Sequence, residues 1–113
     1  MSNRGQAAEA LAADYLRGQR LSILERNFRC RFGEIDLIAQ DGETIVFVEV
    51  RMRGRSDFGG AAESITARKR ERLRKTARFY LAGLRTLPRC RFDALLVSGT
   101  GSNIDWIRDA FGE

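Results

Sequence analysis

The middle of the chain alternates apolar and polar residues in a way that predicts two β-strands, at residues 33–39 and 45–51. Asp41-Gly42 lies between the two segments and is a strong turn signal when it separates alternating apolar runs. Because the connection is this short, the two strands are expected to pair antiparallel. The sequence therefore predicts a β-hairpin in the middle of the chain.

Charged residues interrupt both predicted strands at positions that would otherwise be buried. Asp36 lies in the first strand, and Glu49 and Arg51 lie in the second, where side chains two positions apart share a face. The opposite face is expected to be apolar and to pack into a core through Val46, Val48 and Val50. Charged groups are rarely buried unless they are paired or bind a metal. The acidic face therefore predicts either a site for a cation and a phosphate or a cross-strand ion pair without a function.

The two carboxylates are expected to come close together in the hairpin. Asp36 and Glu49 are 13 positions apart (49 minus 36), five before the expected turn centre and seven after it, so they are near one another without being directly opposite. Two carboxylates within about 4–6 Å repel each other unless a cation lies between them. Mg²⁺ is commonly held by one or two carboxylates together with substrate phosphate and water. The metal interpretation of the hairpin thus places Mg²⁺ at Asp36 and Glu49.

The remaining periodicity predicts two helices and three more strands around the hairpin. Apolar residues recur at helical spacing over residues 4–17, and again over residues 67–84 after the capping residue Thr66. Three further segments are predicted as strands, at residues 21–30, 91–98 and 104–107. The order αβββαββ predicts a single α/β domain, residues 1–113, with a mixed β-sheet and flanking helices.

Each predicted helix carries a charged residue next to its apolar stripe. Glu9 lies at the edge of the stripe of the first helix, where it can look across the buried face toward the sheet, although spacing alone favours a solvated glutamate. Lys69 extends the apolar row of the second helix back by one turn and is expected to point toward the end of the sheet. The other basic residues of this helix predict a solvated face or a phosphate-binding surface. They are Arg68, Arg70, Arg72, Arg74, Lys75 and Arg78.

The charge of the chain favours an anionic partner. Its 113 residues include 20 Lys and Arg against 15 Asp and Glu, a net charge of +5. Only Lys69 and Lys75 are lysines, and arginine is the side chain better suited to forked contacts with phosphate. A basic surface is typical of proteins that bind nucleic acid or an anionic membrane. No apolar run is long enough to cross a membrane, and the first 20 residues do not resemble a signal peptide, so a cytoplasmic protein is expected.

The absence of histidine narrows the chemistry that the chain can perform. The chain has no His, and its two cysteines, Cys30 and Cys90, form no CxxC or Cys/His cluster and are expected to be small core residues. Nucleophilic catalysis by a Ser/His or Cys/His pair is excluded, as is a His-ligated zinc site. Any catalysis must use carboxylates, Lys, Arg, Tyr or a metal ion.

Ordered blocks along nearly the whole chain resemble the restriction-endonuclease-like PD-(D/E)xK nucleases, and most closely the YraN-type endonuclease-like family. The central blocks are residues 33–38, which contain Asp36, and residues 47–53, which contain Glu49. A lone Asp and a lone ExK would be a weak signal, whereas ordered blocks at these spacings are specific. The other matching positions are Gly5, Glu9, Arg26-Asn27, Phe58-Gly59, Lys69, Arg91-Phe92-Asp93 and Asp109-Ala110-Phe111.

This resemblance implies a restriction-endonuclease-like core and a metal-dependent endonuclease that hydrolyses phosphodiester bonds in DNA, including branched or damaged DNA. It implies that Asp36 and Glu49 bind Mg²⁺ or Mn²⁺, and that the cation of the ExK motif, here Arg51, orients the attacking water. Archaeal Holliday-junction resolvases, which are similar, carry an additional glutamate in their first helix, and Glu9 matches it. The expected partner is nucleic acid, with DNA preferred to RNA, and not a membrane.

One residue departs from the motif, because Arg51 occupies the position of its lysine. Arginine stays protonated in proteins, so it can stabilise a transition state but cannot act as a general base. Lys69 is a candidate to supply the missing role from the helix. The sequence leaves open whether the protein is an active nuclease, a nucleic-acid-binding module with a nuclease fold and no turnover, or a protein-interaction scaffold. It also leaves open the choice between DNA and RNA and the oligomeric state, including a homodimer.

Overall fold

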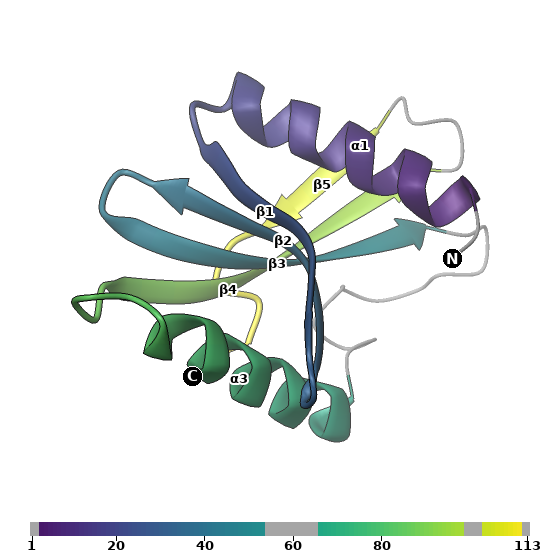
Figure 1. Ribbon diagram of the computed structural model, residues 1–113. Coiled ribbons are helices and arrows are strands. Elements are labelled where there is room, and N and C mark those ends of the chain that lie inside the picture. Colours follow the sequence, from purple (N-terminus) through teal and green to yellow (C-terminus); the bar gives the residue numbers. More distant parts are fainter. Residues whose placement is uncertain (1–2, 54–65, 99–102, 112–113) are drawn as a thin grey trace.

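A five-stranded sheet with one helix on each face makes up the computed structural model, which describes residues 3–53, 66–98 and 103–111 (Figure 1). The elements are α1 (Asn3–Gly18), β1 (Ser22–Cys30), β2 (Gly33–Asp41), β3 (Thr44–Arg53), α3 (Ala67–Ala82), β4 (Arg89–Ser98) and β5 (Ile104–Ile107). Their order confirms the predicted αβββαββ arrangement, while Phe58-Gly59 lies outside the described residues. No helix in these described parts is long and apolar enough to cross a membrane.

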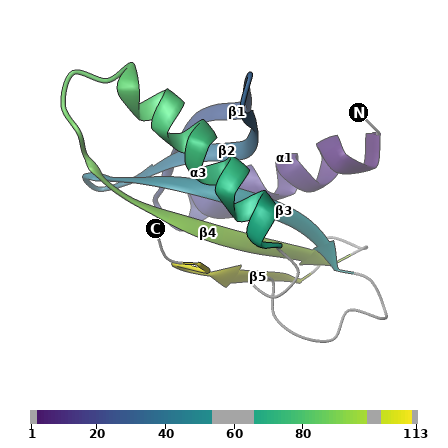
Figure 2. The same ribbon diagram turned by 90° about the horizontal axis from the view of Figure 1, so that it is seen from below.

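The strands lie side by side in the order in which they occur along the chain. β3 and β4 run parallel, whereas the other three neighbouring pairs are antiparallel, so the sheet is mixed as predicted. A parallel pair needs a crossover connection, and α3 lies in the connection between β3 and β4. The crossover places α3 on the face of the sheet opposite to α1, as Figures 1 and 2 show.

The sheet face under α1 forms the first of two cores. Val46 and Val48 of β3 are buried in it and Val50 packs against it partly buried, which confirms the predicted direction of the three valines. Burying a side chain of this size stabilises a fold by about 1.5–3 kcal/mol. The buried residues of this core are Ala12, Ala13, Leu16, Leu21, Leu37, Ala39, Val46, Val48, Leu95 and Val97.

The face under α3 forms the second core, and it is also the hairpin face that carries Glu49, which the prediction described only as the face with acids. Ile45 and Phe47 alternate with the valines along β3 and pack with Leu73 and Ala77 of α3. Because helices cover both faces of the sheet, both sets of alternating side chains are buried. Glu49 follows next on this face, so it lies where the second core meets the first turns of α3.

The ends of α3 are set by two capping residues. The side-chain oxygen of Thr66 accepts a hydrogen bond from the backbone N–H of Lys69 at 3.2 Å, which confirms the predicted N-cap. The helix ends at Ala82, two residues earlier than predicted. Gly83 caps it, because its backbone N–H donates to a carbonyl three residues earlier at 3.1 Å. Leu84, predicted as the last residue of the apolar row, is therefore exposed.

A buried carboxylate fastens the C-terminal segment to the sheet. Asp93 of β4 is fully buried. It accepts hydrogen bonds from Arg91 Nε at 3.0 Å, Trp106 Nε1 at 2.9 Å and the backbone N–H of Asp109 at 2.9 Å. A buried charge is tolerated when it is paired and hydrogen-bonded in this way. The Arg91–Asp93 and Asp109 matches to the nuclease pattern therefore have a structural explanation.

Two arginines of α3 also take part in this packing. Phe111 stacks on Phe92 with ring centroids 5.1 Å apart. The guanidinium carbons of Arg70 and Arg74 lie 5.5 and 5.9 Å from the centroid of the Phe111 ring. The basic surface predicted for α3 is therefore narrower than expected, because these two side chains pack against the C-terminal segment.

Candidate active site

The register of the β2–β3 hairpin differs by one residue from the prediction. Asp41 pairs with Thr44, so the turn is centred on residues 42–43 rather than on residues 41–42. Gly42 has a positive φ of 61°, a conformation that two-residue hairpin turns require and that glycine adopts readily. Continuing this register by one more position would place Asp36 opposite Glu49, because the residue numbers of each pair from Asp41–Thr44 to Leu37–Val48 have the same sum as 36 and 49.

The two strands separate at these carboxylates. The last pair of the ladder is Leu37–Val48, and the backbone N–H of Val50 donates to Asp36 Oδ2 at 2.8 Å. The alternation of β2 changes at the same place. Ile35 and Ile38 are three positions apart and yet both pack in the core under α3. The irregularity places the Asp36 carboxylate between the diverging strands, bound to the backbone of β3.

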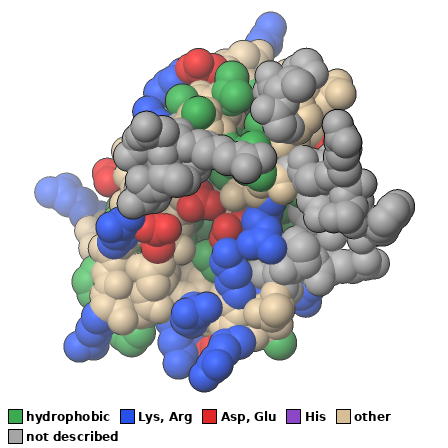
Figure 3. Space-filling view, turned by 90° about the vertical axis from the view of Figure 1, so that its right-hand side faces the viewer, with side chains coloured by type: hydrophobic (Ala, Val, Ile, Leu, Met, Phe, Trp, Pro, Cys, Tyr) green, Lys and Arg blue, Asp and Glu red, His purple; other side chains and the backbone are tan. Residues whose placement is uncertain are grey.

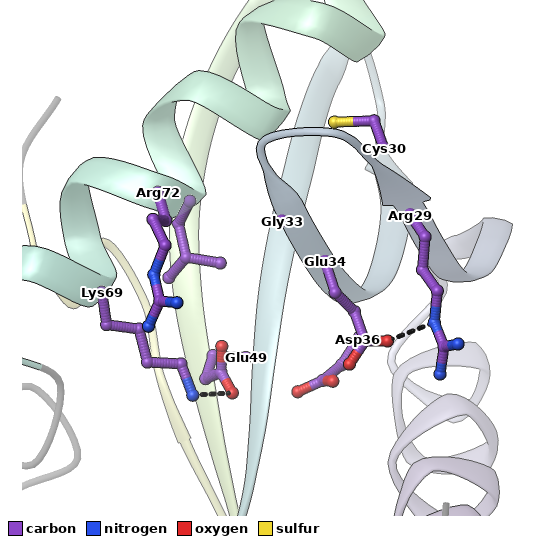
Figure 4. A pocket seen from close by; sticks show the side chains of 9 residues that line it. Arg29, Cys30, Gly33, Glu34, Asp36, Glu49, Lys69 and Arg72 are labelled. Carbon is purple, nitrogen blue, oxygen red and sulfur yellow. Dashed lines mark hydrogen bonds and ion pairs between the residues drawn. The ribbon is translucent and has the colours of Figure 1, made fainter.

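A cleft of about 420 Å³ lies between the start of β2, the end of β3 and the first half of α3 (Figure 4). Figure 3 views the side of the molecule where α3 begins, and acidic side chains near its middle have Lys and Arg side chains beside and below them. The charged residues that line the cleft are Arg29, Glu34, Asp36, Glu49, Lys69 and Arg72. The cleft therefore combines paired carboxylates with three cations, one from β1 and two from α3.

Lys69 of α3 reaches the paired carboxylates. Its Nζ lies 3.1 Å from Glu49 Oε1, and the two side chains are 32% and 8% exposed. This confirms the prediction that Lys69 points toward the end of the sheet. An ion pair this shielded from water is only weakly screened by salt. The position of the ammonium group is thus fixed by the fold.

Burial and the neighbouring Glu49 carboxylate raise the pKa of Asp36 from 3.8 to about 8. The hydrogen bond from Val50 acts in the opposite direction, with a smaller effect, and the charge of Glu9 adds a further small increase. Like charges that are held together in a poorly hydrated place disfavour ionisation of one another. The carboxylate pair therefore favours an added positive charge, whether a proton or a metal ion.

Glu9 of α1 is buried, with 5% of its surface exposed, and one of its carboxylate oxygens has no hydrogen-bond partner among the described residues. The interpretation as a solvated helix glutamate, which spacing alone favoured, is therefore wrong. The predicted direction toward the sheet is confirmed, because the charge of Glu9 acts on Asp36. A buried carboxylate oxygen is costly to leave without a partner, so Glu9 also adds to the demand for positive charge.

The residues of the cleft fit a magnesium ion that takes two ligands from the protein and the others from substrate and water. The described residues contain no group of three or more His, Cys, Asp or Glu side chains placed to hold a metal ion. Asp36 and Glu49 supply two carboxylates, and Mg²⁺ is usually bound by one or two carboxylates plus phosphate oxygens and water. The raised pKa of Asp36 and the unpartnered oxygen of Glu9 are the two observations that favour a cation here.

Residues 8–97 match the family that is described as uncharacterised protein family UPF0102. The chain belongs to this family. A UPF0102 protein of Nitrosomonas europaea is 59% identical over 112 residues, which are 98% of this chain and 95% of that protein. A UPF0102 protein of Nitrosospira multiformis is 57% identical over 109 residues, 96% of this chain and 92% of that protein. The family description names no activity, so the site of this UPF0102 protein has to be interpreted from its own residues.

Arg51 of this UPF0102 chain lies on β3 two residues after Glu49 and is half-buried. It is not among the described residues that line the cleft. The structure therefore brings Asp36, Glu49 and Lys69 together in the cleft. Glu9 is not among the described residues that line the cleft, but its charge acts on Asp36. The role of Arg51 as the cation of the ExK motif stays a prediction.

Two charged residues of the cleft, Arg29 and Glu34, were not predicted from the sequence, and Arg72 was predicted only as part of a basic helix face. Arg29 and Glu34 face each other across the β1–β2 hairpin and form an ion pair. Their pairing depends on a turn at residues 31–32 that carries no strong turn signal. Arg72 lies one turn after Lys69 on α3, so helical spacing from Lys69 could have identified it. All three belong to the wall of the cleft and not to the carboxylate pair.

The raised pKa of Asp36 predicts a pH-dependent stability that Asp36→Asn abolishes. Without metal, the native state binds a proton at Asp36 with a pKa of about 8 against 3.8 when unfolded, so the free energy of unfolding falls as pH rises between these values. The amide keeps an acceptor for Val50 and removes the charge. At about pH 8 we expect the variant to be more stable than wild type by at least about 1.4 kcal/mol, the equivalent of one pKa unit.

Urea unfolding at about pH 5 and about pH 8 in the presence of EDTA measures this difference. Asp14→Asn is the matched control, because Asp14 is an exposed aspartate on α1 that pairs only with Arg17 three residues away, among the described residues. We expect its pH dependence to follow wild type. Parallel pH dependence in wild type and Asp36→Asn would show that the Asp36 carboxyl ionises normally in the fold.

Proposed function

We propose that this UPF0102 protein is a Mg²⁺- or Mn²⁺-dependent endonuclease that hydrolyses phosphodiester bonds in DNA, in the cytoplasm. The observation that carries the proposal is the meeting of Asp36, Glu49 and Lys69 in one cleft. A restriction-endonuclease-like core is supported by the order of the elements, with the aspartate on β2 and the glutamate on the next strand. The resemblance to PD-(D/E)xK nucleases supports the same assignment.

The positions of Asp36, Glu49 and Lys69 suggest a role for each of them in catalysis. Asp36 and Glu49 would hold the ion, which when bound would neutralise the scissile phosphate and lower the pKa of water. Lys69 carries three N–H donors on one ammonium group. Its contact with Glu49 fixes that group where another donor can serve a phosphate oxygen or orient water. Because the chain has no histidine, proton transfer has to use another group, such as a carboxylate, Lys69 or solvent.

The surface charge supports nucleic acid as the partner. The net charge is +5, and Arg29 and Arg72 lie in the wall of the cleft itself. Arginine forms forked hydrogen bonds with phosphate. A polyanion would therefore meet positive charge on both sides of the carboxylate pair. This arrangement favours a phosphodiester substrate over a neutral one.

A second candidate function is a nucleic-acid-binding module that keeps this site without turnover. The observation that favours it is Arg51, which replaces the lysine of the motif and does not line the cleft among the described residues. A cleavage panel separates the two functions. It contains flap, junction, single-stranded and duplex DNA and RNA, each with Mg²⁺ or Mn²⁺. Scission of any member supports the nuclease, whereas binding without scission throughout supports the module.

Mg²⁺ or Mn²⁺ is expected to raise the melting temperature of the wild-type protein, and Asp36→Asn is expected to abolish the increase. A ligand that binds only the folded state stabilises it by RT ln(1 + [L]/Kd), about 2.7 kcal/mol at 100 times Kd. Thermal unfolding followed with and without metal measures the effect. Glu34→Gln is the control, because it alters a carboxylate in the wall of the same cleft. An equal increase in wild type and Asp36→Asn would place the metal elsewhere.

A further inference from the structure

We propose that an exposed strip on α3, together with the β1–β2 turn, binds a single-stranded segment of nucleic acid and leads it to the cleft. The strip consists of Arg68, Arg72, Lys75 and Phe79, and the turn contributes Phe32. The inference rests on the proposed function only in taking the cleft as the place where the strand is cut. It assigns the substrate class, which is nucleic acid with unpaired bases near the scissile phosphate.

The strip follows from the periodicity of α3. Residues three, four and seven positions apart lie on one face of a helix. Arg68, Arg72, Lys75 and Phe79 therefore form one row, and all four are exposed. Arg72 also lines the cleft, and Phe79 lies seven residues further on, about 10 Å along the helix axis. The row thus passes the cleft and continues along α3 to an aromatic ring.

The β1–β2 turn lies against this part of α3, as Figures 1 and 2 show. Gly33 has a positive φ of 151°, and a Cβ at this position would be 3.1 Å from Thr76 Oγ1 and 3.8 Å from Arg72 Cβ. The positive φ and the close approach together favour glycine at this position. It brings Phe32 edge-on to Phe79, with ring centroids 6.2 Å apart. The two rings are consequently held beside the cleft by the packing of the turn on the helix.

Phe79 remains half exposed although its ring packs against two other aromatic rings. Its ring contacts Phe28 and Phe32, yet 48% of the residue remains exposed, and it is the one aromatic among the large exposed apolar residues of the described chain. The guanidinium carbon of Arg31 lies 4.8 Å from the centroid of the Phe32 ring. Cations and aromatic rings are thus interleaved. This combination is typical of proteins that bind single strands, where cations follow the phosphates and rings stack on bases.

Two acidic residues next to the strip, Glu34 and Glu71, are paired with arginines. Glu34 forms an ion pair with Arg29, and Glu71 lies within 3.9 Å of Arg74 and 3.7 Å of Arg78. The strip therefore presents positive charge that complements a phosphate backbone. Bases of a duplex are stacked on their neighbours and cannot reach Phe79, whereas unpaired bases can. The charge and the ring together select a single strand.

The test compares two strands of equal charge in EDTA, so that no cleavage occurs. One is a short labelled oligothymidylate, and the other is an abasic strand of the same length, with binding measured by fluorescence anisotropy. We expect wild type to bind the strand with bases more tightly, and Phe79→Leu to reduce this preference by about 5-fold or more, the lower range for loss of one base–aromatic stack. Phe79→Tyr keeps a ring and is expected to retain the preference.

Two further variants separate stacking from charge and from folding. Arg72→Gln is expected to weaken the binding of both strands by the same factor. It is also expected to reduce the steepness of log K against log salt by about 0.7, the value for one phosphate of a single strand. Leu87→Ala is the control for loss of an exposed apolar side chain, since Leu87 is 81% exposed and lies beyond the C-terminal end of α3. This variant is expected to bind both strands as wild type does. Thermal unfolding of each variant checks that the fold is intact.

The outcomes distinguish this inference from the proposed function. Equal binding of the two strands by wild type overturns the inference, as does an unchanged preference in folded Phe79→Leu. If the preference for the strand with bases depends on Phe79 but the protein cuts no member of the cleavage panel, the single-strand binding site is supported and the proposed nuclease activity is rejected. Strong binding of the RNA counterpart with the same dependence on Phe79 supports the strip and moves the substrate from DNA to RNA.

Discussion

Replacing Glu49 by Gln is expected to reduce cleavage by about 10³-fold or more while nucleic-acid binding persists. The amide keeps the size of the side chain and one acceptor oxygen, but it loses the charge that would hold the ion and that fixes Lys69 Nζ 3.1 Å away. A metal that stabilises the transition state by several kcal/mol corresponds to about 10³ in rate, since 1.36 kcal/mol is tenfold. Initial rates on the best substrate of the panel at saturating metal measure this effect.

Glu34→Gln is the matched control for this experiment. Glu34 lines the same cleft but pairs with Arg29 rather than with Lys69, so we expect its rate to stay within about tenfold of wild type. Equal losses in the two variants would assign the effect to the total charge of the cleft. Full activity in Glu49→Gln, with the metal still required, would remove Glu49 from the metal site and with it the mechanism proposed for this cleft.

The sequence predicted the order of the elements because each element has a strong local signal. Thr66 caps α3, the alternation around Val46 and Val48 identifies β3, and Asp41-Gly42 identifies the hairpin. Whether the second face of the hairpin is buried depends instead on whether a helix covers it. Ile45 and Phe47 read as part of an unbroken apolar run, and only the crossover by α3 explains why both faces are buried.

The paired carboxylates could be found from sequence because a charge in an apolar strand is conspicuous. Asp36 and Glu49 stand out in this way, and the short turn brings their strands together. Their exact alignment could not be found, because one residue of turn register decides it and Asp41-Gly42 fits more than one turn. The change of alternation at Asp36 was also hidden, since it coincides with a hydrogen bond to Val50, fourteen residues away.

Glu9 shows where helical spacing is insufficient. Its place at the edge of an apolar stripe is compatible with solvent or with burial, and the choice depends on how α1 lies across the sheet. Lys69 was easier to place, because an apolar row extended by one turn leads directly to it. Helical spacing does not tell which neighbouring arginines pack on the protein and which line the cleft. In the structure Arg70 lies over the ring of Phe111, and Arg72 lines the cleft.

Lys69 is expected to be the cation on which cleavage depends, in preference to Arg51. Lys69 Nζ lies at the carboxylate pair, whereas Arg51 does not line the cleft among the described residues. We therefore expect Lys69→Ala to lose at least about 10²-fold in rate, the scale for removal of one preorganised transition-state donor. Lys69→Arg keeps the charge and should retain part of the activity. Single-turnover rates at saturating protein separate this loss from weaker binding.

Lys75→Ala and two variants of Arg51 complete the experiment on the same substrate. Lys75 is the other lysine of the chain and is exposed on α3, so its loss is expected to weaken binding without slowing the bound complex. Arg51→Lys restores the residue of the nuclease motif and should keep measurable cleavage, and Arg51→Ala should lose less than Lys69→Ala. The reverse order of losses would make Arg51 the catalytic cation. Cleavage by Arg51→Lys from an inert wild type would instead make the natural protein a binding module, disabled by a single substitution.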